Sequence, residues 1–154
     1  MKKRGIFLLL AALILLRLEH TGTEISELEP VALVRIIASS GSISIRTDTG
    51  AHGSGADLEE AVADLHRSSP ARVFLDTAEY LIINEEGEQL LPEIWDLLRP
   101  ACKICIGSGR FDLDQARAYL AVHPPENTLL ECLAEKKEME VLTIHDGRGC
   151  LGKE

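Results

Sequence analysis

Short apolar runs with strand character alternate along the chain with segments of helical periodicity, and this alternation constrains the fold more than any other feature. Residues 31–38 form an apolar run broken only by Arg35, which predicts a strand buried on both faces. Residues 42–46 alternate apolar and polar side chains after a Ser-Ser-Gly turn, so the two segments predict a hairpin. Two further strands are expected within residues 73–83 and 102–107, and the interpretation of residues 141–144 as a final short strand is left open.

Two helix starts are marked by acidic caps. Asp57 followed by Glu60 is the side-chain pair of a capping box, and Asp112 with Gln115 marks a second start. Strands that alternate with helices imply crossover connections and some parallel pairing. The sequence therefore predicts a layered α/β domain with a mixed, partly parallel sheet of about four strands flanked by helices. The expected helices cover residues 57–66, 90–98, 112–122 and 128–139.

The N-terminus differs from the rest of the chain. Three basic residues at positions 2–4 precede an uninterrupted apolar run at residues 6–16, which Arg17 ends. As a helix this run spans about 17 Å, short of the roughly 30 Å hydrocarbon core of a bilayer. Residues 1–18 are therefore expected to be a signal peptide or a membrane anchor. Residues 24–144 are expected to form a single α/β domain, and residues 145–154 a flexible tail.

Charge and composition argue against nucleic acid as a partner. The formal net charge is −9, and the apolar head carries basic residues but no acid, so the remainder is still more acidic. A phosphate backbone would be repelled by that balance. Aromatic residues make up only 4 % of the chain, which leaves few rings on which bases could stack.

Cys102 and Cys105 form a Cys-x-x-Cys motif, which is typical of thiol-disulfide enzymes and of half of a zinc site. In redox enzymes the first cysteine lies at a helix N-terminus, whereas this pair falls in a strand-like segment. Residues three apart on a strand point to opposite faces. A small exported thiol-disulfide redox protein remains one alternative function.

The glycine-rich stretch at residues 49–56 precedes a helix and is expected to be a flexible loop. Its glycine spacing matches no nucleotide-binding fingerprint, and no lysine follows it. A secreted small-ligand-binding domain that uses residues 50–55 is a second alternative.

The five histidines show no metalloprotease spacing and are expected at the surface or in loops. No catalytic, cofactor-binding or metal residue is assigned, and neither a cofactor nor an enzymatic activity is expected. The histidines are His20, His52, His66, His123 and His145.

Several segments occur in an order that matches one known family. They are residues 24–28 before the strand at 31–37, the loop and helix start at 53–61, residues 68–75 running into 80–86, and 116–120 before two prolines. Through these segments, the stretch from Glu24 to Met139 resembles the N-terminal domain of the C subunit of bacterial spore germinant receptors, the GerAC-like lipoproteins.

The resemblance implies a non-enzymatic, membrane-associated subunit on the outer side of the spore inner membrane. Its partners would be the integral-membrane subunits of the germinant receptor. Two features depart from the family pattern: no cysteine for lipidation lies near Glu19 or His20, and the family continues into further domains. The expected function is scaffolding or contact in spore germination, through an uncleaved hydrophobic anchor; cleavage of the head would make the protein secreted.

Overall fold

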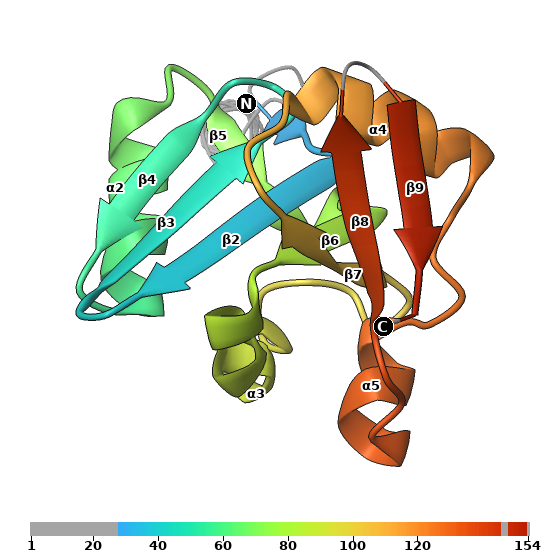
Figure 1. Ribbon diagram of the computed structural model, residues 1–154. Coiled ribbons are helices and arrows are strands. Elements are labelled where there is room, and N and C mark those ends of the chain that lie inside the picture. The colour runs from blue at the N-terminus through green and yellow to red at the C-terminus, as the bar shows by residue number, and fades with distance from the viewer. Residues whose placement is uncertain (1–27, 146–147, 154) are drawn as a thin grey trace, which may run out of the picture.

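The computed structural model describes residues 28–145 and 148–153, which form a seven-stranded mixed sheet with helices on both faces (Figure 1). The strand order is β4-β3-β2-β6-β7-β8-β9. The pairs β2–β6, β6–β7 and β7–β8 are parallel, and the remaining pairs are antiparallel. The strands are β2 (Leu33–Ser39), β3 (Ser42–Thr47), β4 (His52–Gly55), β6 (Tyr80–Ile83), β7 (Lys103–Ser108), β8 (Glu140–His145) and β9 (Arg148–Gly152).

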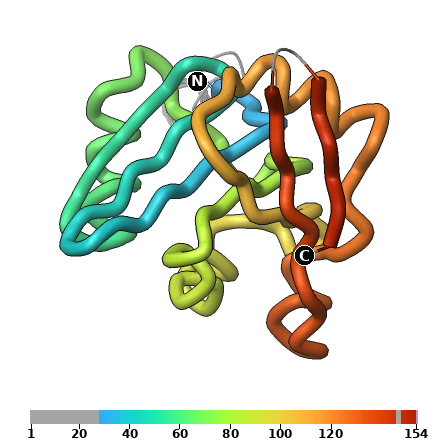
Figure 2. Tube along the Cα trace, in the orientation of Figure 1, coloured from blue at the N-terminus to red at the C-terminus, as the bar shows by residue number. Residues whose placement is uncertain are grey.

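Two short strands lie outside this sheet, and the helices connect the parallel strands. β1 (Leu28–Pro30) pairs with β5 (Arg72–Phe74) in a separate parallel ribbon. Figure 2 shows the β2–β3–β4 meander on one side of the molecule and the β8–β9 hairpin on the other. The helices are α2 (Leu58–Ser68), α3 (Leu91–Ile94), α4 (Leu113–Val122) and α5 (Leu129–Glu135), with 3₁₀ turns η2 (Leu75–Thr77) and η3 (Glu85–Leu90).

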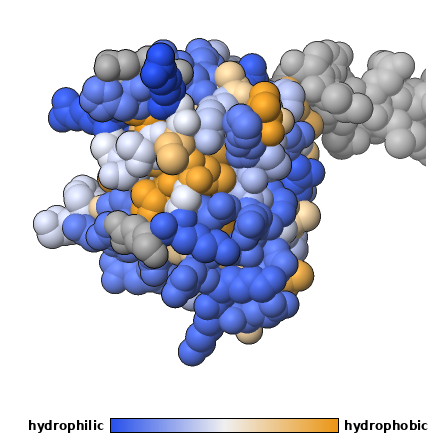
Figure 3. Space-filling view, turned by 45° about the vertical axis from the view of Figure 1, so that its right-hand side comes forward, coloured by the Kyte–Doolittle hydropathy of each residue, from blue (hydrophilic) through white to orange (hydrophobic). Residues whose placement is uncertain are grey.

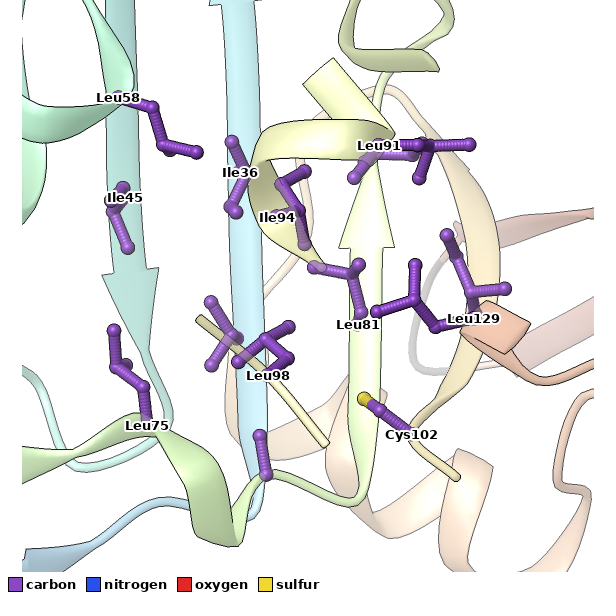
Figure 4. Close-up of a cluster of buried hydrophobic side chains, with 14 of the residues drawn as sticks. Ile36, Ile45, Leu58, Leu75, Leu81, Leu91, Ile94, Leu98, Cys102 and Leu129 are labelled. Atoms are coloured by element: carbon purple, nitrogen blue, oxygen red, sulfur yellow. The ribbon is translucent and has the colours of Figure 1, made fainter. Parts of the chain in front are cut away.

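The two faces of the sheet bury separate apolar clusters, as the alternation along β6 shows. Leu81 and Ile83 belong to the larger cluster, whereas Ile82 between them belongs to the smaller one. The larger cluster packs against α2, α3 and α5, and Figure 4 shows its side chains. The smaller cluster packs against α4 through Ala116 and Leu120. Helices thus cover the centre of the sheet on both sides.

The β2–β3–β4 meander is covered on one face only. α2 packs behind β3 and β4, and the opposite face of the meander carries no helix (Figure 1). Outward positions on that open face, Arg46, His52 and Ser54, are exposed. The sheet therefore presents polar side chains to solvent next to the start of α4.

The sheet has seven strands instead of the expected four, because residues 141–144, whose assignment the sequence left open, belong to β8 and two glycine-rich segments are strands as well. The expected flexible loop at residues 49–56 contains β4, which pairs with β3 from His52 to Gly55. The expected flexible tail at residues 145–154 contains β9, which pairs with β8 from Arg148 to Gly152. Neither segment has alternating apolar side chains, so the strand pattern is missing from the sequence.

The expected helix starts are confirmed, but two helices are shorter than expected. Asp57 and Asp112 accept hydrogen bonds from backbone amides at the starts of α2 and α4, and Thr128 caps α5. The expected helix at residues 90–98 is reduced to α3, which follows the 3₁₀ turn η3. The helix expected to reach residue 139 ends at Glu135, because Lys136 adopts a left-handed backbone with φ of 52°.

The expected signal peptide or anchor at residues 1–18 lies outside the described residues, as does the first part of the segment that resembles the germinant-receptor family. Within the described part of the chain, no helix has both the length and the apolar character needed to span a bilayer. Figure 3 shows that hydrophilic side chains cover most of one side of the molecule, around an apolar area near its middle.

Candidate functional site

Two arginines lie side by side on the open face of the meander. On β2, Val34 and Ile36 point into the larger apolar cluster, so Arg35 between them points to the opposite face. In the hairpin register Arg35 is directly opposite Arg46 of β3. Cross-strand partners have Cβ atoms about 5 Å apart, so the two side chains start as neighbours.

Contacts with the loop before α4 hold the Arg35 guanidinium in place. Its Nη2 donates to the carbonyl oxygen of Gly109 at 2.7 Å, and its central carbon lies 4.1 Å from the centroid of the Phe111 ring. A side chain at Gly107 would collide with Phe111 and with Ile82, so the glycine in β7 makes room for the ring. Burial and, secondarily, the charge of Arg46 lower the pKa of Arg35. The group is thus oriented before any ligand arrives.

Asp48 borders this region, and both oxygens of its carboxylate accept hydrogen bonds from the protein. One carboxylate oxygen, Oδ1, accepts hydrogen bonds from the amides of Ala32 and Leu33, both at 3.2 Å. The other oxygen, Oδ2, pairs with Nη1 of Arg117 on α4 at 3.1 Å. The Asp48 side chain is only 2 % exposed. Asp48 therefore ties β2, β3 and α4 together around the site.

These elements enclose an open pocket of roughly 440 Å³. Arg35, Arg46 and His52 line its sheet side, and Asp112 and Asp114 line its helix side. Asp112 accepts hydrogen bonds from the amides of Asp114 and Gln115 at 2.9 and 3.1 Å, which is its capping role in α4. We call this feature the arginine pocket, and its volume falls in the range of small-molecule sites.

The cysteines of the Cys-x-x-Cys motif lie on opposite faces of the sheet, as the strand reading predicts. Cys102 belongs to the larger apolar cluster and Cys105 to the smaller one, and both are fully buried and free. Burial raises the pKa of each thiol to about 12. Thiols on opposite faces of a strand cannot form a disulfide with one another, and at neutral pH neither is a thiolate. This geometry does not support the thiol-disulfide alternative.

Among the glycines of residues 50–55, Gly50 lines the pocket, and Gly53 and Gly55 pack against α2. A Cβ on Gly53 or Gly55 would collide with the backbone of α2, so these glycines let β4 lie close against that helix. The Asp57 carboxylate accepts from the amide of Glu60 at 2.8 Å, and the Glu60 carboxylate accepts from the amide of Ala56 at 3.0 Å. Anion binding at the start of α2 is not supported, because its caps are carboxylates.

The histidines are dispersed over the described structure. His52 lies opposite Arg46 in the sheet, while His66 lies in the last turn of α2. His123 caps the end of α4, where its ring centroid lies 4.9 Å from that of Tyr119. His145 ends β8. Within residues 28–145 and 148–153 no group of three potential metal-ligating side chains comes together.

The arginine pocket was not identified from the sequence, although one signal was available. The hairpin expected at residues 31–46, closed by a turn at Ser40 and Gly41, pairs Ser39 with Ser42 and therefore Arg35 with Arg46. Phe111 and the start of α4 join the pocket from more than 60 residues away, and no local pattern indicates that contact. Comparison with protein-family models, with curated proteins and with solved structures finds no match to this chain.

Proposed function

We propose that this protein is a non-catalytic domain, held at the outer side of a membrane by its N-terminal segment, that binds a partner. At the finer level we propose that it contacts the integral-membrane subunits of a spore germinant receptor at the spore inner membrane. The basic, apolar head supports the membrane location. The ordered sequence segments that resemble the germinant-receptor C subunit support the finer assignment.

The observation that carries the binding role is the open face of the meander. Its two arginines line a pocket at the surface, and α2 leaves this face of β2–β4 free. Charged side chains on an uncovered sheet face can contact another molecule without rearrangement of the fold. The buried thiols Cys102 and Cys105 are instead packed among apolar side chains, which favours binding over thiol chemistry.

The membrane location is tested by fractionation of sporulating cells that carry an epitope tag at the C-terminus. The tagged protein is expected in the membrane fraction, with the tag accessible to protease from the outer side of that membrane. Deletion of residues 1–18 is expected to release it from the membrane fraction. Protein that remains in the vegetative cytosol with the head intact would contradict the proposal.

The finer assignment has its own test. Cross-linking in dormant spores is expected to capture integral-membrane germinant-receptor subunits, and deletion of the gene is expected to slow nutrient-triggered germination. A deletion strain that germinates at the normal rate, with no receptor subunit captured, would contradict the link to germination. It would leave the membrane location standing, because fractionation measures that separately.

A further inference from the structure

The arginine pocket holds two like charges, Arg35 and Arg46, that are not directly paired with any described carboxylate. Arg35 and Arg46 are cross-strand partners, and like charges in that position destabilise a sheet. Among the described residues, neither arginine forms an ion pair with a carboxylate. The nearby Asp48 is already paired with Arg117, and Asp112 already caps α4. An anion placed between the two arginines would relieve their repulsion.

The geometry of Arg35 suits an oxyanion. A guanidinium presents five N–H donors in a planar fork, and the bond to Gly109 uses one Nη2 donor. The cation–π contact with Phe111 restricts the position of the guanidinium. Carboxylate and phosphate oxygens match such a fork with two parallel hydrogen bonds. Because the group is already oriented, little conformational entropy is lost when a ligand binds.

We propose that the arginine pocket binds the oxyanion group, a carboxylate or a phosphate, of a small molecule between Arg35 and Arg46. The roughly 440 Å³ of the pocket limits the ligand to a small molecule. Asp112 and Asp114 on the helix side repel further negative charge, so a ligand with one carboxylate or phosphate group is favoured over a polyanion. This site does not depend on the proposed membrane partner, and it gives the small-ligand alternative a defined location.

The test is anion binding by the purified full-length protein in nonionic detergent. Thermal unfolding and calorimetry are followed with sodium acetate and with sodium phosphate as probes, against sodium chloride at matched ionic strength. Saturable binding is expected with at least one probe at concentrations up to about 10 mM, together with a rise in Tm. Acetate binding alone indicates a carboxylate ligand, and phosphate binding alone indicates a phosphate ligand.

Two pairs of variants separate the site from general electrostatics. Arg46→Gln is expected to weaken binding at least fivefold, whereas Arg67→Gln, on the exposed side of α2, changes net charge equally and leaves binding unchanged. Asp114→Asn is expected to strengthen binding, and the exposed Asp96→Asn is its charge-matched control. Because Arg46 is exposed and repels Arg35, Arg46→Gln is expected to keep or raise the Tm without probe.

The outcomes are decisive in both directions. Binding that falls in Arg46→Gln and rises in Asp114→Asn, with both controls unchanged, supports the pocket. Absence of saturable binding to either probe overturns the proposal. Equal weakening in Arg46→Gln and Arg67→Gln also overturns it, because binding would then follow net charge rather than position.

Discussion

Asp48 is the side chain whose loss is expected to disturb the region around the pocket most. Asp48→Ala removes the acceptor of the two amides at the start of β2 and the partner of Arg117. A partly buried donor left without an acceptor costs about 1–3 kcal/mol. The Arg117 side chain is 53 % exposed, so the ion pair itself contributes only about 0–1 kcal/mol.

Because both hydrogen bonds are only partly buried, each amide is expected near the lower end of the range of about 1–3 kcal/mol, so the expected loss of unfolding free energy in Asp48→Ala is about 2–4 kcal/mol, mostly from the two amides. In a chain of this size that lowers the Tm by roughly 6–12 °C. Asp48→Asn keeps an acceptor oxygen and is expected to cost about 1 kcal/mol. Urea unfolding followed by circular dichroism measures these differences, with the exposed Asp96→Ala as a control for loss of a carboxylate.

The order in which the variants lose unfolding free energy tests whether the two amides carry the stability. If Arg117→Ala destabilises the protein as much as Asp48→Ala, the ion pair carries the stability and the reasoning from the amides is wrong. The same holds if Asp48→Ala costs less than about 1 kcal/mol, because the two amides would then find water or another acceptor. A double-mutant cycle between Asp48 and Arg117 isolates the pair term in either case.

Two further predictions follow from packing. Gly53→Ala is expected to lower the free energy of unfolding, measured in urea, by about 2–3 kcal/mol, because the new Cβ meets the backbone of α2. Gly152→Ala is the control: open space surrounds that position, so the change is expected to be less than about 0.5 kcal/mol. Equal effects of the two substitutions would contradict the close approach of β4 to α2. The exposed thiol of Cys150 is expected to react with a chromogenic disulfide reagent in the folded protein. Burial raises the pKa of the Cys102 and Cys105 thiols to about 12, so these two thiols are expected to react only when the protein unfolds. Rapid reaction of either buried thiol in the folded protein would contradict their placement.

The elements that the sequence predicted well are those with a local physical cause. A cap is a hydrogen bond between residues three or fewer positions apart, so Asp57, Asp112 and Thr128 mark helix starts regardless of what surrounds them. Alternating side chains in β3 likewise record which of its faces is buried. The opposite placement of Cys102 and Cys105 follows from the same two-residue period.

The elements that the sequence missed depend on distant partners. β4 and β9 contain glycines and few apolar side chains, and each becomes a strand because a neighbouring strand offers backbone hydrogen bonds. At β4 the glycines are required by the closeness of α2, which no local pattern encodes. The four-strand estimate therefore counted only strands that carry their own apolar pattern.

The amino-acid sequence by itself determined the α/β class, the capped helix starts and the pairing of Arg35 with Arg46, because caps, periodicity and hairpin register act within a few residues. Only the tertiary structure created the arginine pocket. Phe111 and Asp114 lie more than 60 residues from the arginines and are brought beside them when α4 packs on the sheet. Burial of apolar surface drives that packing without regard to sequence distance, so the site exists only in the folded chain.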